Sequence, residues 1–128
     1  MALKTIPQIE EFAAQAGQYL NGNTDTKIAY ALRKVLKNAE SAAKHYNEDL
    51  EDLRIEHALT GEHGAILRDE KNGYKFDKAG LRALNTAAKK LHKDQVYEVN
   101  SHMVSDNIYE LTEEQVSAFE GFILPLLS

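Results

Sequence analysis

Hydrophobic residues recur every three or four positions through most of this chain, which is the period of amphipathic helices. The first such stretch runs from Pro7 to Leu20. Proline suits the first turn of a helix, because its missing N–H would have no partner there. Asn21, Gly22 and Asn23 follow, and a glycine at this point is typical of a helix end. We therefore expect a short helix at 7–20.

A much longer helix is predicted from about residue 24 to 59, with Thr24 or Asp25 as its N-cap. Neither glycine nor proline interrupts this stretch, and a rise of about 1.5 Å per residue gives a rod of roughly 50 Å. Its hydrophobic face resembles a heptad pattern with one additional four-residue step around Ala39. The expected positions on this face are Ile28, Leu32, Val35, Ala39, Ala43, Tyr46, Leu50 and Leu53.

A β-hairpin is predicted at 65–76, because Asn72-Gly73 between strand-forming residues is typical of a two-residue type I′ turn. This turn requires positive φ at both residues and pairs Glu70 with Lys75 across the ladder. Residues 96–99 alternate in polarity and are rich in valine, so they predict a third strand beside the hairpin. The expected sheet is small and antiparallel, with helices over one face.

Two further helices complete the prediction. One begins at the cap Asp77 and runs to about His92, and the last covers 112–122 and stops before Pro125. The sum is a single α+β domain over 1–128 that is mostly helical, with one long central helix, three shorter helices and the small sheet. Residues 1–60 form its helical part, and 61–128 carry the hairpin, a helix, a strand and the C-terminal helix. Residues 100–110 give no clear signal.

The composition is that of a globular protein, with 43% hydrophobic and 27% charged residues in 128. The absence of cysteine excludes a disulfide framework, a thiol nucleophile, a cysteine-type zinc site and an iron–sulfur cluster. A net charge of −5 works against nucleic-acid binding. No signal-peptide pattern and no long apolar run occurs, so we expect a cytoplasmic protein without membrane contact.

Nothing in the residue pattern predicts catalysis, a cofactor or a small-molecule site. His57 and His63 are six positions apart with Gly61 between them, which does not fit the helical spacing of a zinc-binding histidine pair. The carboxylates at 48–52 favour a solvated helix face over an acid–base pair, which needs a desolvated carboxyl. The aromatic residues of the predicted sheet favour packing onto helices over stacking on bases. We therefore expect no enzyme and no metal.

The charges of the long helix are segregated. Residues 27–44 carry five basic residues and one acid, a net charge of +4, whereas 45–59 carry one basic residue and five acids, a net charge of −4. An antiparallel copy of the same helix would match the basic half to the acidic half, with affinity from the hydrophobic face. Alternatively, the basic helix near 77–92 lies against the acidic half within one chain. The candidate interaction residues are Lys34, Lys37, Glu48, Glu51 and Asp52.

Four segments together resemble a known group of proteins. They are the helix end at 52–60, the stretch 68–81 with its run Asp69-Glu70-Lys71-Asn72-Gly73-Tyr74-Lys75-Phe76, the strand 96–99 and the capping segment 111–115. This order resembles small proteins of tailed bacteriophages and prophages, over about residues 48–123. The resemblance brings no functional residues. It implies a phage-related origin and a place in the virion or the host cytoplasm.

Two hypotheses follow from the sequence. The first is a non-enzymatic structural, assembly or protein-interaction protein whose long helix contacts a protein partner or a second copy of the chain. The second is a small acidic inhibitor of a host defence protein, with the acids of the long helix occupying a basic cleft. The state of association separates them, because a specific oligomer favours the first and a monomer the second.

Overall fold

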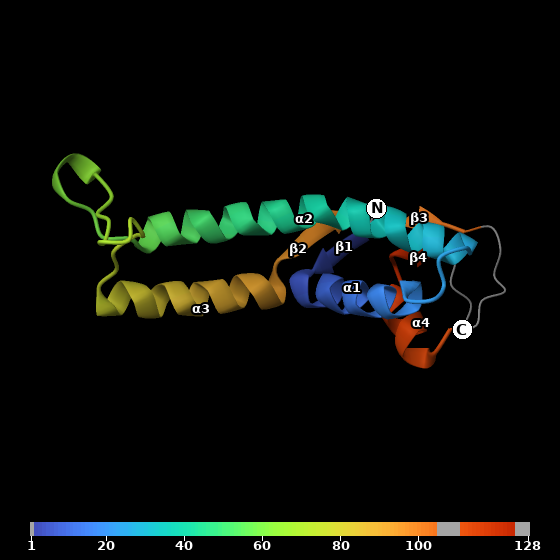
Figure 1. Cartoon of the computed structure of the whole chain (residues 1–128). Coiled ribbons are helices and arrows are strands. Elements are labelled where there is room, and N and C mark those ends of the chain that lie inside the picture. Colours follow the sequence, from blue (N-terminus) through green and yellow to red (C-terminus); the bar gives the residue numbers. More distant parts are fainter. Residues whose placement is uncertain (1, 105–110, 125–128) are drawn as a thin grey trace.

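The computed structural model describes residues 2–104 and 111–124 of the 128-residue chain. The helices are α1 (Ile6–Leu20), α2 (Lys27–His57), α3 (Lys78–Asp94) and α4 (Glu113–Phe119), with a short 3-10 turn at Glu62–Gly64. The strands are β1 (Ala2–Thr5), β2 (Val96–Val99), β3 (His102–Met103) and β4 (Ile123–Leu124). The α+β class with one long helix is confirmed, and α2 runs along most of the elongated molecule (Figure 1).

Threonine caps start the first two helices. The Thr5 hydroxyl accepts from the Gln8 N–H, and the Gln8 side chain accepts from the Thr5 N–H at 2.9 Å, so the pair forms a capping box for α1. The cap of α2 is Thr26, whose hydroxyl accepts from the Ala29 N–H at 3.0 Å. The predicted caps Thr24 and Asp25 are therefore wrong by one or two positions, because the helix starts later than its breaker-free stretch.

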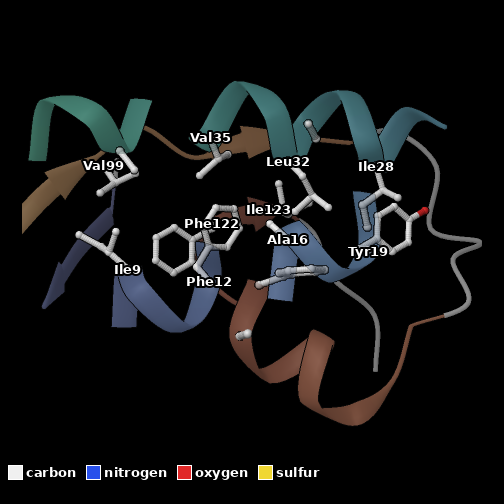
Figure 2. Close-up of a cluster of buried hydrophobic side chains, with 14 of the residues drawn as sticks. Ile9, Phe12, Ala16, Tyr19, Ile28, Leu32, Val35, Val99, Phe122 and Ile123 are labelled. Atoms are coloured by element: carbon white, nitrogen blue, oxygen red, sulfur yellow. The ribbon is translucent and has the colours of Figure 1, made fainter. Parts of the chain in front are cut away.

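The core lies between α1 and the N-terminal half of α2. Figure 2 shows Ile28, Leu32 and Val35 of α2 pointing toward the aromatic rings below them, and all three are fully buried. Phe12 of α1 stacks on Phe122 with ring centroids 4.4 Å apart. It also meets the ring of Phe119 edge-on at 5.6 Å, so aromatic packing joins α1 to α4 and to the chain that follows α4.

The buried face of α2 differs from the predicted one at a single step. Ala42 is fully buried and Ala43 is exposed, whereas the sequence placed Ala43 on this face. A straight helix of about 3.6 residues per turn keeps Ala39, Ala42 and Tyr46 on one side. Between Ala39 and Tyr46 the face therefore steps by three and then four residues, in place of the predicted four and then three.

The strand at 96–99 is confirmed, but its predicted partner is wrong. β2 pairs antiparallel with β1 at the N-terminus, with Ala2 opposite Val99 and Thr5 opposite Val96. Tyr97 and Val99 are its buried residues, so this two-stranded sheet closes one side of the core. β3 and β4 form a second, parallel pair with His102 opposite Ile123. The hairpin segment belongs to neither sheet.

The turn at 69–73 is longer than predicted. The Asp69 N–H donates to the Gly73 carbonyl at 2.8 Å, and the Asn72 N–H donates to the Asp69 carbonyl at 3.0 Å, which leaves a three-residue loop between them. Only Asn72 has positive φ, at 64°, and Gly73 does not. The type I′ turn and the pairing of Glu70 with Lys75 are therefore wrong. The Asp69 carboxylate accounts for this, because it accepts from the Lys71 and Gly73 N–H groups at 2.9 Å each.

The loop between α2 and α3 is fixed by a closed ring of backbone hydrogen bonds. The Leu59 N–H donates to Lys75 at 2.8 Å, the Lys75 N–H to Leu67 at 3.1 Å, and the Leu67 N–H back to Leu59 at 2.9 Å. Three passes of the chain are thus tied together without forming a regular sheet. The loop therefore has a defined backbone, although its side chains lie at the surface.

The last two helices keep their predicted caps. Asp77 accepts from the Gly80 N–H at the start of α3, and Thr112 and Gln115 form the capping box of α4. α4 ends at Phe119, earlier than predicted, because Gly121 with φ of 83° turns the chain. Phe122 therefore reaches the core from the segment after the helix. Pro125 and residues 105–110 lie outside the described residues.

Candidate functional site

The long helix divides the molecule into two parts. We refer to residues 43–94, which comprise the C-terminal half of α2, the following loop and α3, as the arm. The remaining described residues form the body. Figure 1 shows α3 running beside the C-terminal half of α2 and ending next to α1. From residue 43 to residue 96 no residue is buried, whereas the body contains every fully buried side chain that the structure describes.

The arm is hydrophobic along its inner contact but remains open to solvent. Leu50 and Leu53 lie in the half of α2 that packs beside α3, and together with Leu84 and Leu91 of α3 they are only half-buried. Further out, Ile55, Leu67 and Leu81 are 41%, 40% and 47% exposed. Two helices packed side by side cannot enclose the residues between them, so the flanks of this contact remain uncovered.

The structure places the five candidate interaction residues on the side of α2 that faces away from α1 and α3. Lys34, Lys37, Glu48 and Asp52 are exposed, and Glu51 is half-buried. They span the helix from its basic half to its acidic half, about 27 Å at 1.5 Å per residue. The prediction that affinity comes from the hydrophobic face of α2 is wrong, because the body and α3 already occupy that face.

Some of these charges have partners within the chain. The Lys34 Nζ lies 5.4 Å from the centre of the Tyr30 ring, a cation–π contact. A Glu48 oxygen lies 3.6 Å from His45 Nδ1, one turn away on the helix. Both contacts are exposed and lie within α2 itself, so neither brings another element onto the outer face of this helix.

Glu51 connects the arm's loop to α2. The Tyr74 hydroxyl donates to one Glu51 oxygen, and Arg54 Nη1 lies 3.4 Å from the other. The hydrogen bond from Tyr74, followed by the charge of Arg54, lowers the pKa of Glu51 against the opposing effect of desolvation. The same hydrogen bond raises the pKa of Tyr74. The Arg68 guanidinium in turn lies 4.6 Å from the centre of the Tyr74 ring.

A second carboxylate–tyrosine pair was missed by sequence reasoning. Asp49 accepts from the Tyr97 hydroxyl at 2.7 Å, which joins the arm half of α2 to β2. Burial is the main cause that raises the pKa of Tyr97, and the Asp49 hydrogen bond adds to it. A signal was present, because Asp49 falls between Tyr46 and Leu53 on the hydrophobic face of the helix. A carboxylate in that position needs a donor.

The alternative arrangement within one chain is correct about position. α3 does lie against the acidic half of α2. Within the described residues, however, no ion pair of 4.0 Å or less links the two helices. One contact at the base of the arm joins α3 to α1, where His92 Nε2 lies 2.8 Å from a Glu10 oxygen. The charges of α2 and α3 therefore point outward rather than toward each other.

The surface of the body has one further feature, a groove. An open groove between α1 and α4 is lined by exposed side chains that include Gln8, Glu11 and Glu114. Lys4 closes one end, donating to the Glu120 carbonyl at 3.1 Å and lying over the Phe122 ring at 5.0 Å. Within 2–104 and 111–124 no cluster of three or more metal-ligating side chains occurs. No helix in the same ranges is long and apolar enough to cross a membrane.

Comparison of the chain with protein-family models, with curated proteins and with solved structures finds no match. The resemblance to small phage proteins therefore stays a prediction.

Proposed function

We propose that this protein is a non-enzymatic protein-interaction protein that presents its long helix and arm to a protein partner. The observation that carries the proposal is the run of residues from 43 to 96 without a buried residue. A stretch of this length is normally stabilised by packing, because the ordering of each residue costs about 1–2 kcal/mol of conformational entropy. A partner that covers the flanks of the arm supplies the missing burial.

The construction of the arm supports this proposal. Its loop is tied by the ring of backbone hydrogen bonds through Leu59, Leu67 and Lys75, and it is anchored to α2 through Tyr74 and Glu51. Such ties lower the entropy that is lost on binding, because the contact surface is already shaped. A structural or assembly role, in line with the phage resemblance, uses a rigid projection of this kind.

Site-specific photocrosslinking tests the proposal. A photoreactive phenylalanine analogue replaces Ile55 or Leu81 on the arm, and Gln18 on the exposed side of α1 serves as the control. We expect discrete covalent adducts from the arm positions, both in concentrated pure protein and in the native cells. If the arm positions give no more adduct than Gln18 in either setting, the proposed function is wrong.

A further inference from the structure

The outer face of α2 carries a symmetric arrangement of residues. Two contacts with other parts of the chain reach it, where the Tyr30 ring meets the His102 ring edge-on at 5.5 Å and where Glu51 accepts from Tyr74. Counting up from Tyr30, the outward positions are 33, 34, 37 and 41. Counting back from Ile55, they are 52, 51, 48 and 44, so both series have the intervals 3, 1, 3 and 4. These positions share one face of a helix with about 3.6 residues per turn. The midpoint of the pattern lies between Ala42 and Ala43, where the body meets the arm.

The charges on this face are opposite at symmetric positions. In an antiparallel pair of α2 helices centred on this midpoint, two residues lie opposite each other when their numbers add up to 85. The facing pairs are Arg33 with Asp52, Lys34 with Glu51, and Lys37 with Glu48. A two-fold axis repeats each pair, so three complementary pairs become six in a dimer.

The uncharged positions fit the same alignment. Tyr30 falls opposite Ile55, and each of these side chains is 41% exposed in the single chain. Lys44 falls opposite Ser41, so no pair of positions in this alignment joins two like charges, although the two Lys44 side chains lie on either side of the two-fold axis. Apolar contacts would therefore close both ends of a polar interface about 38 Å long, at 1.5 Å of rise per residue.

We infer that the partner of the outer face of α2 is a second copy of this chain, docked antiparallel with its basic half on the acidic half of the first. This inference rests on the proposed function and names the partner for one of its surfaces. Opposite charges across an interface set orientation and association rate more than affinity. The dimer is therefore reversible and weakens as salt is added.

Glu51 is available for this contact despite its partners in the chain. An ionised carboxylate has about four acceptor positions, and Tyr74 and Arg54 use only part of them. Because Tyr74 fixes this side chain, Glu51 is better left unchanged in a test. The test therefore changes two other pairs, Arg33 with Asp52 and Lys37 with Glu48.

Sedimentation velocity on the full chain, from low to high micromolar concentration and at two salt concentrations, is the direct test. We expect a monomer–dimer equilibrium in the wild type, and about a tenfold or greater rise in Kd for Arg33→Glu with Lys37→Glu, which turns four attractive contacts into repulsive ones. Adding Glu48→Lys and Asp52→Arg restores the dimer. The matched control carries the same charge change on α3, Lys89→Glu with Lys93→Glu, and keeps a Kd within about threefold.

Spin labels distinguish antiparallel from parallel docking, and the natural absence of cysteine allows single labelling. Labels introduced by Lys44→Cys lie close together near the two-fold axis, whereas labels introduced by Asp52→Cys lie about 28 Å apart along the helices. A parallel dimer gives short distances at both positions and overturns the inference. A wild type that stays monomeric at low salt, or a dimer insensitive to the Arg33 and Lys37 reversals, overturns it as well. The proposed function is tested separately, and it is wrong only if the crosslinking experiment on the arm is negative as well.

Discussion

The aromatic cluster around Phe12 provides the sharpest test of where the stability of this molecule lies. Phe12 is fully buried, stacks on Phe122 at 4.4 Å and meets Phe119 edge-on at 5.6 Å. Phe12→Ala removes a large buried side chain and both ring contacts. A truncation of this kind costs about 3–5 kcal/mol of the free energy of unfolding.

That loss is a large part of the total free energy of unfolding. A chain of 128 residues has a free energy of unfolding of about 6–19 kcal/mol, from typical values per residue. With an unfolding entropy of about 2.1 cal/mol/K per residue, a loss of 4 kcal/mol lowers Tm by about 15 °C. We therefore expect Phe12→Ala to be unfolded, or close to it, at temperatures where the wild type is native.

The assay is urea unfolding followed by far-ultraviolet circular dichroism, with Leu81→Ala as the control. Leu81 is an arm residue that is 47% exposed, and its truncation should cost less than about 1 kcal/mol. If Phe12→Ala loses less than about 1 kcal/mol, the core does not lie between α1 and the N-terminal half of α2 as described. If Leu81→Ala loses as much as Phe12→Ala, the arm is buried in solution and the proposed function loses its basis.

Three further predictions concern backbone conformation and pH. Asn72→Val forces a branched side chain into positive φ and should cost about 1–2 kcal/mol in thermal unfolding, more than Gly73→Ala, which keeps an ordinary φ. Gly80→Ala brings a Cβ to 3.0 Å from the His57 carbonyl oxygen, so faster hydrogen exchange is expected at the start of α3 despite its better helix propensity. The raised pKa of Tyr97 predicts that its stabilising contribution, measured against Tyr97→Phe, is constant below about pH 10 and disappears as the pH rises further. Equal pH profiles for the two proteins would contradict that hydrogen bond.

The helices could be predicted from sequence because their signals are local. A cap, a period of three or four and a terminal breaker all lie within the element they define, as Asp77 does for α3 and Thr112 for α4. The sheet could not be predicted, because β1 has only four residues and its partner β2 lies more than 90 positions away. Nothing in Ala2–Thr5 identifies that partner.

The prediction of the turn at 69–73 was wrong for a different reason. The Asn-Gly pair favours a two-residue hairpin, but the side chain of Asp69 offers the backbone two further hydrogen bonds in a longer turn. Local side-chain chemistry thus competed with turn propensity and won. The pairing of Asp49 with Tyr97 was missed for a similar reason, because the sequence pattern does not identify the specific partner of a polar side chain.

The candidate interaction residues could be chosen from sequence only as charges on one helix. Their exposure followed from helical period, but two facts needed the structure. The hydrophobic face of α2 is used within the chain, and the acidic half has α3 beside it without ion pairs among the described residues. Both facts move the proposed contact from the hydrophobic face to the outer one.

The charge order along α2 costs the single chain very little. The helix dipole acts within about the first and last turn, where Lys27 is the only basic residue at the start and Arg54 and His57 favour the end. Glu48 and Glu51 lie further in and barely feel it. A segregation of charge that neither stabilises nor strains its own helix contributes little to folding, so its proposed use is to orient a second copy. In that dimer the charges would select the antiparallel register, while Tyr30 and Ile55 would bury apolar surface at its ends.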